Sequence, residues 1–245
     1  MLALKDVVLV KDNKTILQID DFHLERGERL AVIGPNGAGK STFLKVLALL
    51  EPPTSGEVFF RGEKVTGKNS LDFRRRMAVV FQEPLLLNTT VFNNVAQGMY
   101  FRGITGAQRQ RRVDYWLERF GITALRHRKP LHLSGGEAQR VSLARAFVLE
   151  PEVVFLDEPF SALDFSTRLE LLEELGALLA NTGVTTVFVT HDFNEIPYLT
   201  DKVAVIDQGN MVYKGGLKEL LAGEVTVPAV QRLLEPFKRS GLIPG

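Results

Sequence analysis

The segment from Gly34 to Thr42 has residue types and a spacing that suit phosphate binding. It reads GPNGAGKST, follows an apolar run of strand length and fits the pattern G-x-x-x-x-G-K-[ST]. Its glycines let backbone N–H groups turn toward phosphate oxygens, and a helix expected from Lys40 to Leu50 adds its positive end. The alternative is a glycine-rich turn with an exposed lysine. The full pattern favours a phosphate site made of Gly34, Pro35, Asn36, Gly37, Ala38, Gly39, Lys40, Ser41 and Thr42.

Two of these side chains and a pair of acids suggest the accompanying chemistry. Lys40 is expected to contact the β- and γ-phosphates of a nucleotide, and Ser41 to bind Mg2+. The apolar run from Val153 to Leu156 leads directly into Asp157 and Glu158. Asp157 would hold Mg2+, directly or through water, and Glu158 would orient or deprotonate an attacking water. The alternative is that Asp157 and Glu158 are only two solvated acids at a strand end. The phosphate site upstream argues against this alternative.

The elements that must position these residues alternate between apolar runs of strand length and longer stretches of helical period. Such alternation predicts an α/β fold with a largely parallel, buried sheet. The runs of strand length are Leu30 to Ile33, Met77 to Phe81, Val153 to Leu156, Thr185 to Thr190 and Val203 to Ile206.

Two regions depart from this alternation. From about residue 84 to 149, helical patterns at Val91 to Arg102 and Gly106 to Phe120 follow one another without a strand between them, which predicts an inserted helical subdomain. The N-terminal part alternates like antiparallel strands, with turns at Asp12-Asn13 and Gly62. Residues 1–225 are expected to form one domain, and residues 226–245 a short C-terminal tail: a helix with a frayed end.

Composition excludes several classes of protein. The 245 residues carry 30 Lys and Arg against 29 Asp and Glu, and a net charge of +1 argues against a nucleic-acid partner. Cysteine is absent, which rules out disulfides, thiolate metal sites and a cysteine nucleophile. The uncharged run from Pro84 to Phe101 is too polar for a bilayer core. Lys5 and Asp6 interrupt the first apolar run, so no signal peptide is expected.

Further motifs lie between and after these two sites, and their order resembles that of the ATP-binding subunits of ABC transporters. The resemblance extends over essentially the whole chain and implies a P-loop NTPase core. In order, the matches are the phosphate loop, a glutamine loop at Gln82, the signature LSGGEAQR at Leu133 to Arg140, the acids Asp157 and Glu158, a D-loop at Asp164, and a switch histidine at His191.

The resemblance implies roles for these residues, with ATP and Mg2+ as ligands. Gln82 would reach Mg2+ or the attacking water, and His191 would hydrogen-bond the γ-phosphate and support Glu158. Asp164 would bridge two subunits. By the same resemblance, the active unit is a head-to-tail dimer in which three signature residues contact the γ-phosphate of ATP on the other subunit: Ser134, Gly135 and Gly136.

Several of these residues also have local explanations. Ser134 and Glu137 fit the capping box S-x-x-E at a helix N-terminus, here a helix from about Gly136 to Leu149. Many family members carry Gln in place of Glu137, and we expect this carboxylate to turn toward its own helix rather than toward phosphate. Asp164 could cap a helix, His191 could be a structural histidine, and Gln82 a polar strand end.

One feature of the family is missing. Its members usually stack an aromatic side chain on adenine near the turn after the first strand, where this chain has Val10-Lys11-Asp12-Asn13. The stem of Lys11 or the side chain of Val10 would have to cover the base. We therefore expect little selectivity between ATP and GTP.

The resemblance favours the ATPase subunit of an importer at the cytoplasmic face of the membrane. Its partners would be transmembrane permease subunits, a second ATPase subunit and, indirectly, an extracytoplasmic substrate-binding protein. The stretch from Gln82 to Gly103, with the signature, looks most like subunits that serve tungstate, molybdate and related oxyanions. The alternatives are an exporter or lipid-handling complex, and an ABC ATPase acting on ribosomes or DNA. A small-molecule kinase is disfavoured because the signature and D-loop would have no role.

Overall fold

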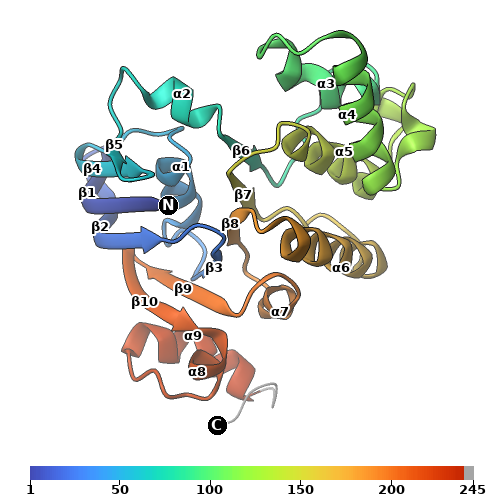
Figure 1. Cartoon of the computed structure of the whole chain (residues 1–245). Helices are drawn as coiled ribbons and strands as arrows, with labels where there is room; N and C mark the ends of the chain where they lie inside the picture. Colours follow the sequence, from blue (N-terminus) through green and yellow to red (C-terminus); the bar gives the residue numbers. More distant parts are fainter. Residues whose placement is uncertain (240–245) are drawn as a thin grey trace.

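The computed structural model describes residues 1–239, whose strands form one mixed sheet with helices packed on it (Figure 1). The strands are β1 (Leu2–Lys11), β2 (Lys14–Leu24), β3 (Arg29–Ile33), β4 (Ser55–Phe60), β5 (Glu63–Lys64), β6 (Met77–Val80), β7 (Val153–Asp157), β8 (Thr185–Val189), β9 (Lys202–Asp207) and β10 (Asn210–Gly216). The α-helices are α1 (Lys40–Leu47), α2 (Ser70–Arg74), α3 (Val91–Tyr100), α4 (Gly106–Arg119), α5 (Gly135–Phe147), α6 (Phe165–Thr182), α7 (Ile196–Leu199), α8 (Leu217–Leu221) and α9 (Pro228–Arg239). Short 3-10 turns are η1 (Thr123–Leu125), η2 (Pro130–His132) and η3 (Phe193–Glu195).

The sheet has a parallel part and an antiparallel part. Its strand order is β5-β4-β1-β2-β10-β9-β3-β8-β7-β6. The strands from β9 to β6 run parallel, whereas β2, β1, β4 and β5 pair antiparallel. β10 joins the two parts, because it runs antiparallel to β9 and meets β2 at the single pair Asn210 and Gln18. The predicted fold class is thereby confirmed.

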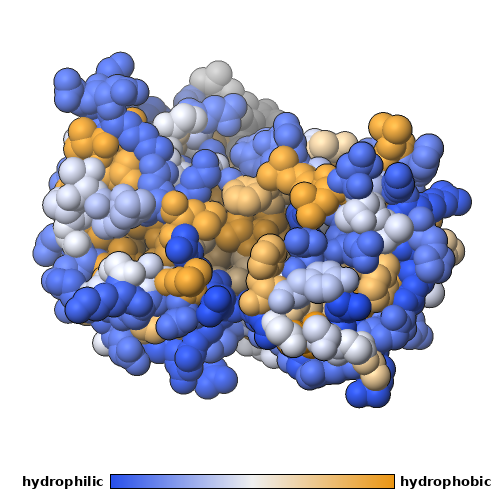
Figure 2. Space-filling model, turned by 90° about the horizontal axis from the view of Figure 1, so that it is seen from above, coloured by the Kyte–Doolittle hydropathy of each residue, from blue (hydrophilic) through white to orange (hydrophobic). Residues whose placement is uncertain are grey.

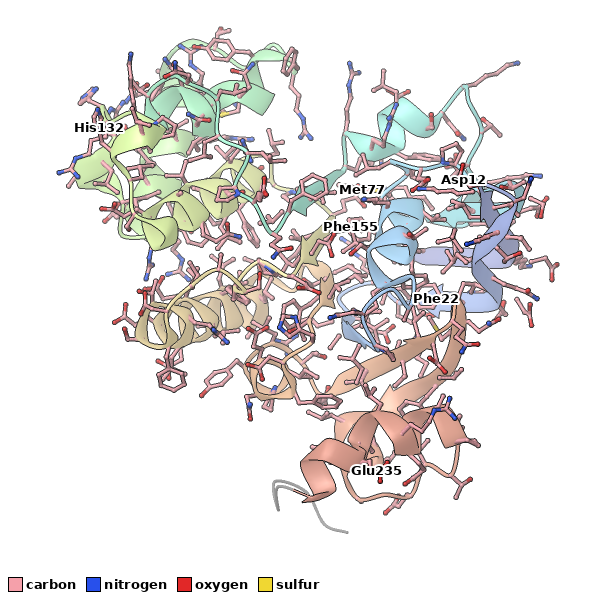
Figure 3. The ribbon with its side chains drawn as sticks, turned by 180° about the vertical axis from the view of Figure 1, so that it is seen from behind. Asp12, Phe22, Met77, His132, Phe155 and Glu235 are labelled. Atoms are coloured by element: carbon pink, nitrogen blue, oxygen red, sulfur yellow. The ribbon has the colours of Figure 1, made fainter. Side chains whose placement is uncertain are left out.

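The parallel strands are buried on both faces, since successive side chains enter different cores. Phe155 belongs to the core around α1, whereas its neighbours Val154 and Leu156 belong to the core under α5 and α6. Figure 3 shows Phe155, Met77 and Phe22 around α1. The Phe22 ring meets the Phe43 ring of α1 edge to face, with centroids 5.0 Å apart. Burial on both faces explains why these strands appear as continuous apolar runs.

The antiparallel N-terminal strands confirm the predicted alternation. Their hairpin turns at Asp12 and Asn13, which have φ angles of 48° and 59°. Both residue types tolerate the left-handed region that a tight hairpin turn requires. Gly62, with φ of 82°, makes the predicted turn between β4 and β5.

Helices α3, α4 and α5 form a separate group between β6 and β7, set apart from the N-terminal strands (Figure 1). Their shared core includes Met99 of α3, Trp116 of α4 and Phe147 of α5, and the Trp116 and Phe147 rings lie 5.3 Å apart. The segment contains no strand among the described residues, as its helical patterns predicted. His132 of η2 lies on this side of the molecule and Asp12 on the opposite side (Figure 3).

The boundaries of several elements differ from those expected. The helix predicted for residues 40–50 ends at Leu47, because Leu49 takes a left-handed φ of 58° and the Leu50 N–H bonds back to the Lys45 carbonyl at 2.9 Å. The helix expected from Gly136 to Leu149 begins at Gly135 and ends at Phe147. The tail contains α9, and the frayed end predicted for it lies outside the described residues. Within residues 1–239, none of the helices has the length and apolarity that crossing a bilayer requires.

Candidate nucleotide site

The carboxyl ends of four neighbouring strands bring most of the predicted residues to one edge of the sheet. Strand register aligns Val32 of β3 with Val189 of β8, Val189 with Asp157 of β7, and Leu156 with Val80 of β6. The phosphate loop, His191, Glu158 and Gln82 each follow one of these strands. Ligand sites of open α/β sheets lie at this kind of edge.

The phosphate loop is built by close approach of the backbone to β9. Gly34 has φ of 150°, and a Cβ placed on it would lie 2.0 Å from the Ile206 carbonyl oxygen. Lys40, the first residue of α1, is only 6% exposed, and its Nζ donates to the carbonyls of Gly34 at 2.9 Å and Pro35 at 3.0 Å. These two bonds hold the ammonium group inside the curve of the loop.

Burial also affects the charge of this lysine. Desolvation lowers the pKa of Lys40, and the carboxylates of Glu158 and Asp157 oppose that shift. The acids therefore favour the charged form that phosphate binding needs.

Ser41 and Asp157 form an oxygen pair suited to a hard divalent cation. The Ser41 hydroxyl donates to Asp157 Oδ1 at 2.9 Å across 116 residues of sequence. Adjacent ligands of an octahedral Mg2+ with bonds of about 2.1 Å have a similar separation, so this donor set fits the ion. Burial raises the pKa of Asp157, and the hydrogen bond from Ser41 works against that rise.

Glu158 and His191 come together beside this pair. His191 Nδ1 lies 3.1 Å from Glu158 Oε2, and the Glu158 N–H donates to the Val189 carbonyl at 3.0 Å. Glu158 has a left-handed φ of 48°, a conformation that costs free energy in residues other than glycine. The strand therefore ends in a turn at Glu158.

The signature residues lie at the N-terminus of α5. Ser134 Oγ accepts from the Glu137 N–H at 3.2 Å, and Glu137 Oε2 accepts from the Ser134 N–H at 2.7 Å, which completes the capping box. Glu137 thus turns toward its own helix, as expected. A Cβ on Gly136 would lie 2.5 Å from Thr167 Cγ2 of α6, so glycine lets the two helix ends approach closely. Ser134 and Gly135 are exposed.

Asp164 is the N-cap of α6. Its Oδ1 accepts from the Ser166 hydroxyl at 2.7 Å and from the Thr167 N–H at 3.1 Å. These hydrogen bonds, that from Ser166 foremost, lower the pKa of Asp164 well below its usual range. Asp164 therefore caps a helix of its own chain, and it is also exposed to solvent.

Gln82 is exposed and directly follows β6. The residues after it are held by Arg145, a side chain that the sequence did not point to. Arg145 of α5 donates to the carbonyls of Pro84 at 2.6 Å and Leu85 at 2.9 Å. Burial lowers the pKa of this guanidinium. The position of Arg145 could have indicated this contact, because Arg145 lies on the same face of α5 as the buried Ser142. A cation on a buried face needs hydrogen-bond acceptors from another segment.

The residues considered for adenine contact lie on the antiparallel part. Lys11 pairs with Glu51, and Val10 is 40% exposed. In all, the structure brings the phosphate loop, Asp157, Glu158 and His191 together. Ser134, Gly135, Gly136 and Asp164 form a second group at the starts of α5 and α6.

Comparison with known proteins agrees with this geometry. The family model described as ABC transporter matches residues 17–161, and the chain belongs to this family. It is an ABC ATPase cassette that binds ATP.

Individual relatives give more detail. The chain is 37% identical to the energy-coupling factor transporter ATP-binding protein EcfA of Methanoculleus marisnigri, over 91% of this chain and 83% of that protein. It is 40% identical to the molybdate/tungstate import ATP-binding protein WtpC of Thermococcus kodakarensis, over 82% of this chain and only 61% of that protein. The dimeric ATP-binding cassette MJ0796 bound to ADP and Pi superposes with a TM-score of 0.80 at 29% identity, covering 89% of this chain and 99% of that one. Other relatives are named for iron, sulfate or polyamine import.

Proposed function

We propose that this chain is the ATP-hydrolysing subunit of an importer, which acts as a head-to-tail dimer on the cytoplasmic face of a membrane. The observation that carries ATP hydrolysis in this proposal is the pairing of Glu158 with His191 at 3.1 Å, beside the bonded pair Ser41 and Asp157. This arrangement sets a base, a phosphate-binding loop and a cation site at one sheet edge.

The chain's own residues perform most of the reaction. Backbone N–H groups of the phosphate loop and the N-terminus of α1 bind the phosphates, and Lys40 adds its charge. Glu158 orients the attacking water and accepts its proton as the water adds to the γ-phosphorus and the ADP oxygen leaves. His191 holds Glu158 and donates to the γ-phosphate. Ser41, Asp157 and Gln82 would hold Mg2+, which would neutralise phosphate charge.

A second copy of the chain would complete each site. The exposed N-terminus of α5, with Ser134, Gly135 and Gly136, offers N–H groups to an anion from outside the chain. Asp164 lies at the neighbouring helix start and would bridge the two subunits. In a dimer with a two-fold axis the two contacts repeat, which gives two composite sites. The similar cassette MJ0796 is dimeric, which supports the proposal of a dimer.

The membrane partner would dock where the helical subdomain, residues 84–149, meets the rest of the chain. Figure 2 shows a hollow between two lobes with apolar residues in it. Leu85 and Leu87 follow Gln82 and are 58% and 47% exposed. Arg145 joins this loop to the signature helix, so the loop and the signature would move together as nucleotide binds and leaves.

The proposed transported substrate is an oxyanion. WtpC is named as a molybdate/tungstate import ATP-binding protein, and its 40% identity supports an oxyanion such as these. A substrate-binding protein would deliver it to the permease.

The test is affinity purification of the tagged full chain from gently solubilised native membranes, with partners identified by mass spectrometry. We expect a multi-spanning permease, and we expect the variant Leu85→Ser/Leu87→Ser to lose it. Leu50→Ser is the matched control, because Leu50 is 46% exposed but follows α1. Recovery of ribosomal or DNA-repair proteins without a membrane protein would contradict the proposal.

A further inference from the structure

Arg168 of α6 bridges two segments that flank the proposed catalytic pair. Its Nη2 donates to the Leu163 carbonyl at 3.1 Å, just before the cap residue Asp164. Its Nη1 donates to Asp192 Oδ2 at 3.2 Å, and Asp192 directly follows His191. Both charged side chains are 27% exposed. One guanidinium thus connects the loop before α6 with the segment that carries the histidine.

The residues on either side of His191 are held to each other. The Asp192 N–H donates to Thr190 Oγ1 at 3.0 Å. The Thr190 hydroxyl donates in turn to Glu195 Oε2 at 2.6 Å, and Glu195 is only 4% exposed. The position of Asp192 therefore fixes the backbone from which the imidazole extends.

The segment between Glu158 and Leu163 is a compact turn. Ser161 Oγ donates to the Glu158 carbonyl at 3.0 Å, and the Leu163 N–H donates to the Phe160 carbonyl at 3.1 Å. Together with the contact of 3.1 Å between Glu158 and His191, these bonds close a ring. The ring runs from Glu158 through the turn to Arg168, on to Asp192, and back through His191.

We propose that Arg168 is a positioning residue for ATP hydrolysis, which closes this ring and so sets His191 against Glu158. The inference rests on the proposed roles of those two residues. An arginine suits the position because its planar fork directs two donors at fixed acceptors, whereas lysine has one flexible ammonium group. The ring also makes the placement of His191 depend on the loop that carries Asp164, which a second subunit would contact.

The test combines steady-state turnover and ATP affinity of the purified full chain. We expect Arg168→Gln to lower kcat about tenfold or more, since small displacements of reacting groups have effects of this size. ATP affinity should stay within about twofold, because the phosphate loop is untouched. Arg168→Lys should recover part of kcat. Asp192→Asn should lower kcat similarly, and the double variant should be no worse than either single one.

Arg112→Gln is the matched control. Arg112 lies on α4, is 29% exposed and pairs with Glu150 at 3.2 Å, so it is a similar ion pair outside the ring. Its kcat should stay within about twofold of wild type. If Arg168→Gln does not fold, Asp192→Asn, which nearly preserves side-chain size, gives the same comparison.

Two results would overturn the assignment: a kcat of Arg168→Gln and Asp192→Asn within about twofold of wild type, or losses that multiply in the double variant. Glu158→Gln distinguishes a failure of the role proposed for Arg168 from a failure of the whole proposed mechanism. If Glu158→Gln abolishes turnover and Arg168→Gln stays within about twofold of wild type, only the role of Arg168 fails. If Glu158→Gln retains turnover, the proposed mechanism fails.

Discussion

The phosphate-binding half of the site and the signature half are built in different ways. In the phosphate half, Lys40 and Asp157 are 6% and 9% exposed, and the bond between Ser41 and Asp157 joins residues 116 apart in sequence. In the signature half, Ser134 is exposed and the bonds of its capping box reach only three residues along the chain. The first half is assembled by the fold, whereas the second is a capped helix end.

This difference shows which half can work within one chain. A buried lysine, acid and hydroxyl are costly unless they are hydrogen-bonded. Here Lys40 donates to the Gly34 and Pro35 carbonyls, and Ser41 donates to Asp157. An exposed helix N-terminus has N–H groups directed outward and a favourable dipole for an anion. The signature therefore suits a ligand presented by a second subunit.

The largest expected effect separates binding from chemistry within the phosphate half. Glu158→Gln keeps the size of the side chain but removes its basicity, so turnover should fall by about 100-fold or more. ATP binding should persist, because Lys40 and the loop backbone remain. Turnover and nucleotide affinity of the purified chain check this. A kcat close to wild type would contradict the role of Glu158 as a base.

The sequence predicted that the segments of the phosphate half follow neighbouring strands, because each segment is local. GPNGAGKST and the strand that ends in Asp157 and Glu158 are contiguous, and parallel strands carry such ends to one edge. The contacts of Arg145 and Arg168 were not predicted, since they depend on loops 60 and 24 residues away. β10 and α8 were missed as well: β10 is only half-buried along its length and ends in two glycines, so no apolar run marks it.

A smaller effect concerns the base of the nucleotide. Lys11 and Val10 lie on the exposed antiparallel part, in contrast to the buried phosphate loop. Affinities for ATP and GTP should therefore differ by less than about tenfold, or 1.4 kcal/mol. Competition between the two nucleotides measures this. A much larger preference for ATP would mean that another side chain stacks on adenine.

Variants of Glu137 test whether the signature half is stabilised by its capping box. Glu137→Ala removes the acceptor for the Ser134 N–H and should lower the free energy of unfolding by about 1 kcal/mol. Glu137→Gln keeps an acceptor, so it should cost less and leave turnover within about twofold. Chemical denaturation and turnover check both variants. Loss of activity in Glu137→Gln with unchanged stability would indicate direct contact with nucleotide.

The smallest expected effect is a dependence of the protein's stability on pH, which comes from Glu195. Burial raises the pKa of Glu195, the nearby Asp192 charge adds to this, and the Thr190 hydrogen bond and the Arg168 and His191 charges oppose it. The folded state then binds this proton more tightly than the unfolded state, so stability decreases as pH rises from 4.5 through the folded pKa. Glu195→Gln should remove that decrease. Denaturation curves across this range test it, and identical pH profiles would contradict it.

The composite site is tested most directly by mixing two chains that are each inactive alone. Lys40→Ala impairs the phosphate half, and Ser134→Arg blocks the signature half, so each variant alone should have almost no turnover. A mixed dimer has one complete site. An equimolar mixture should recover roughly a quarter of wild-type turnover, because about half of the dimers are mixed and each has one of two sites intact. A mixture as inactive as its components, or an active Ser134→Arg chain, would contradict the composite site.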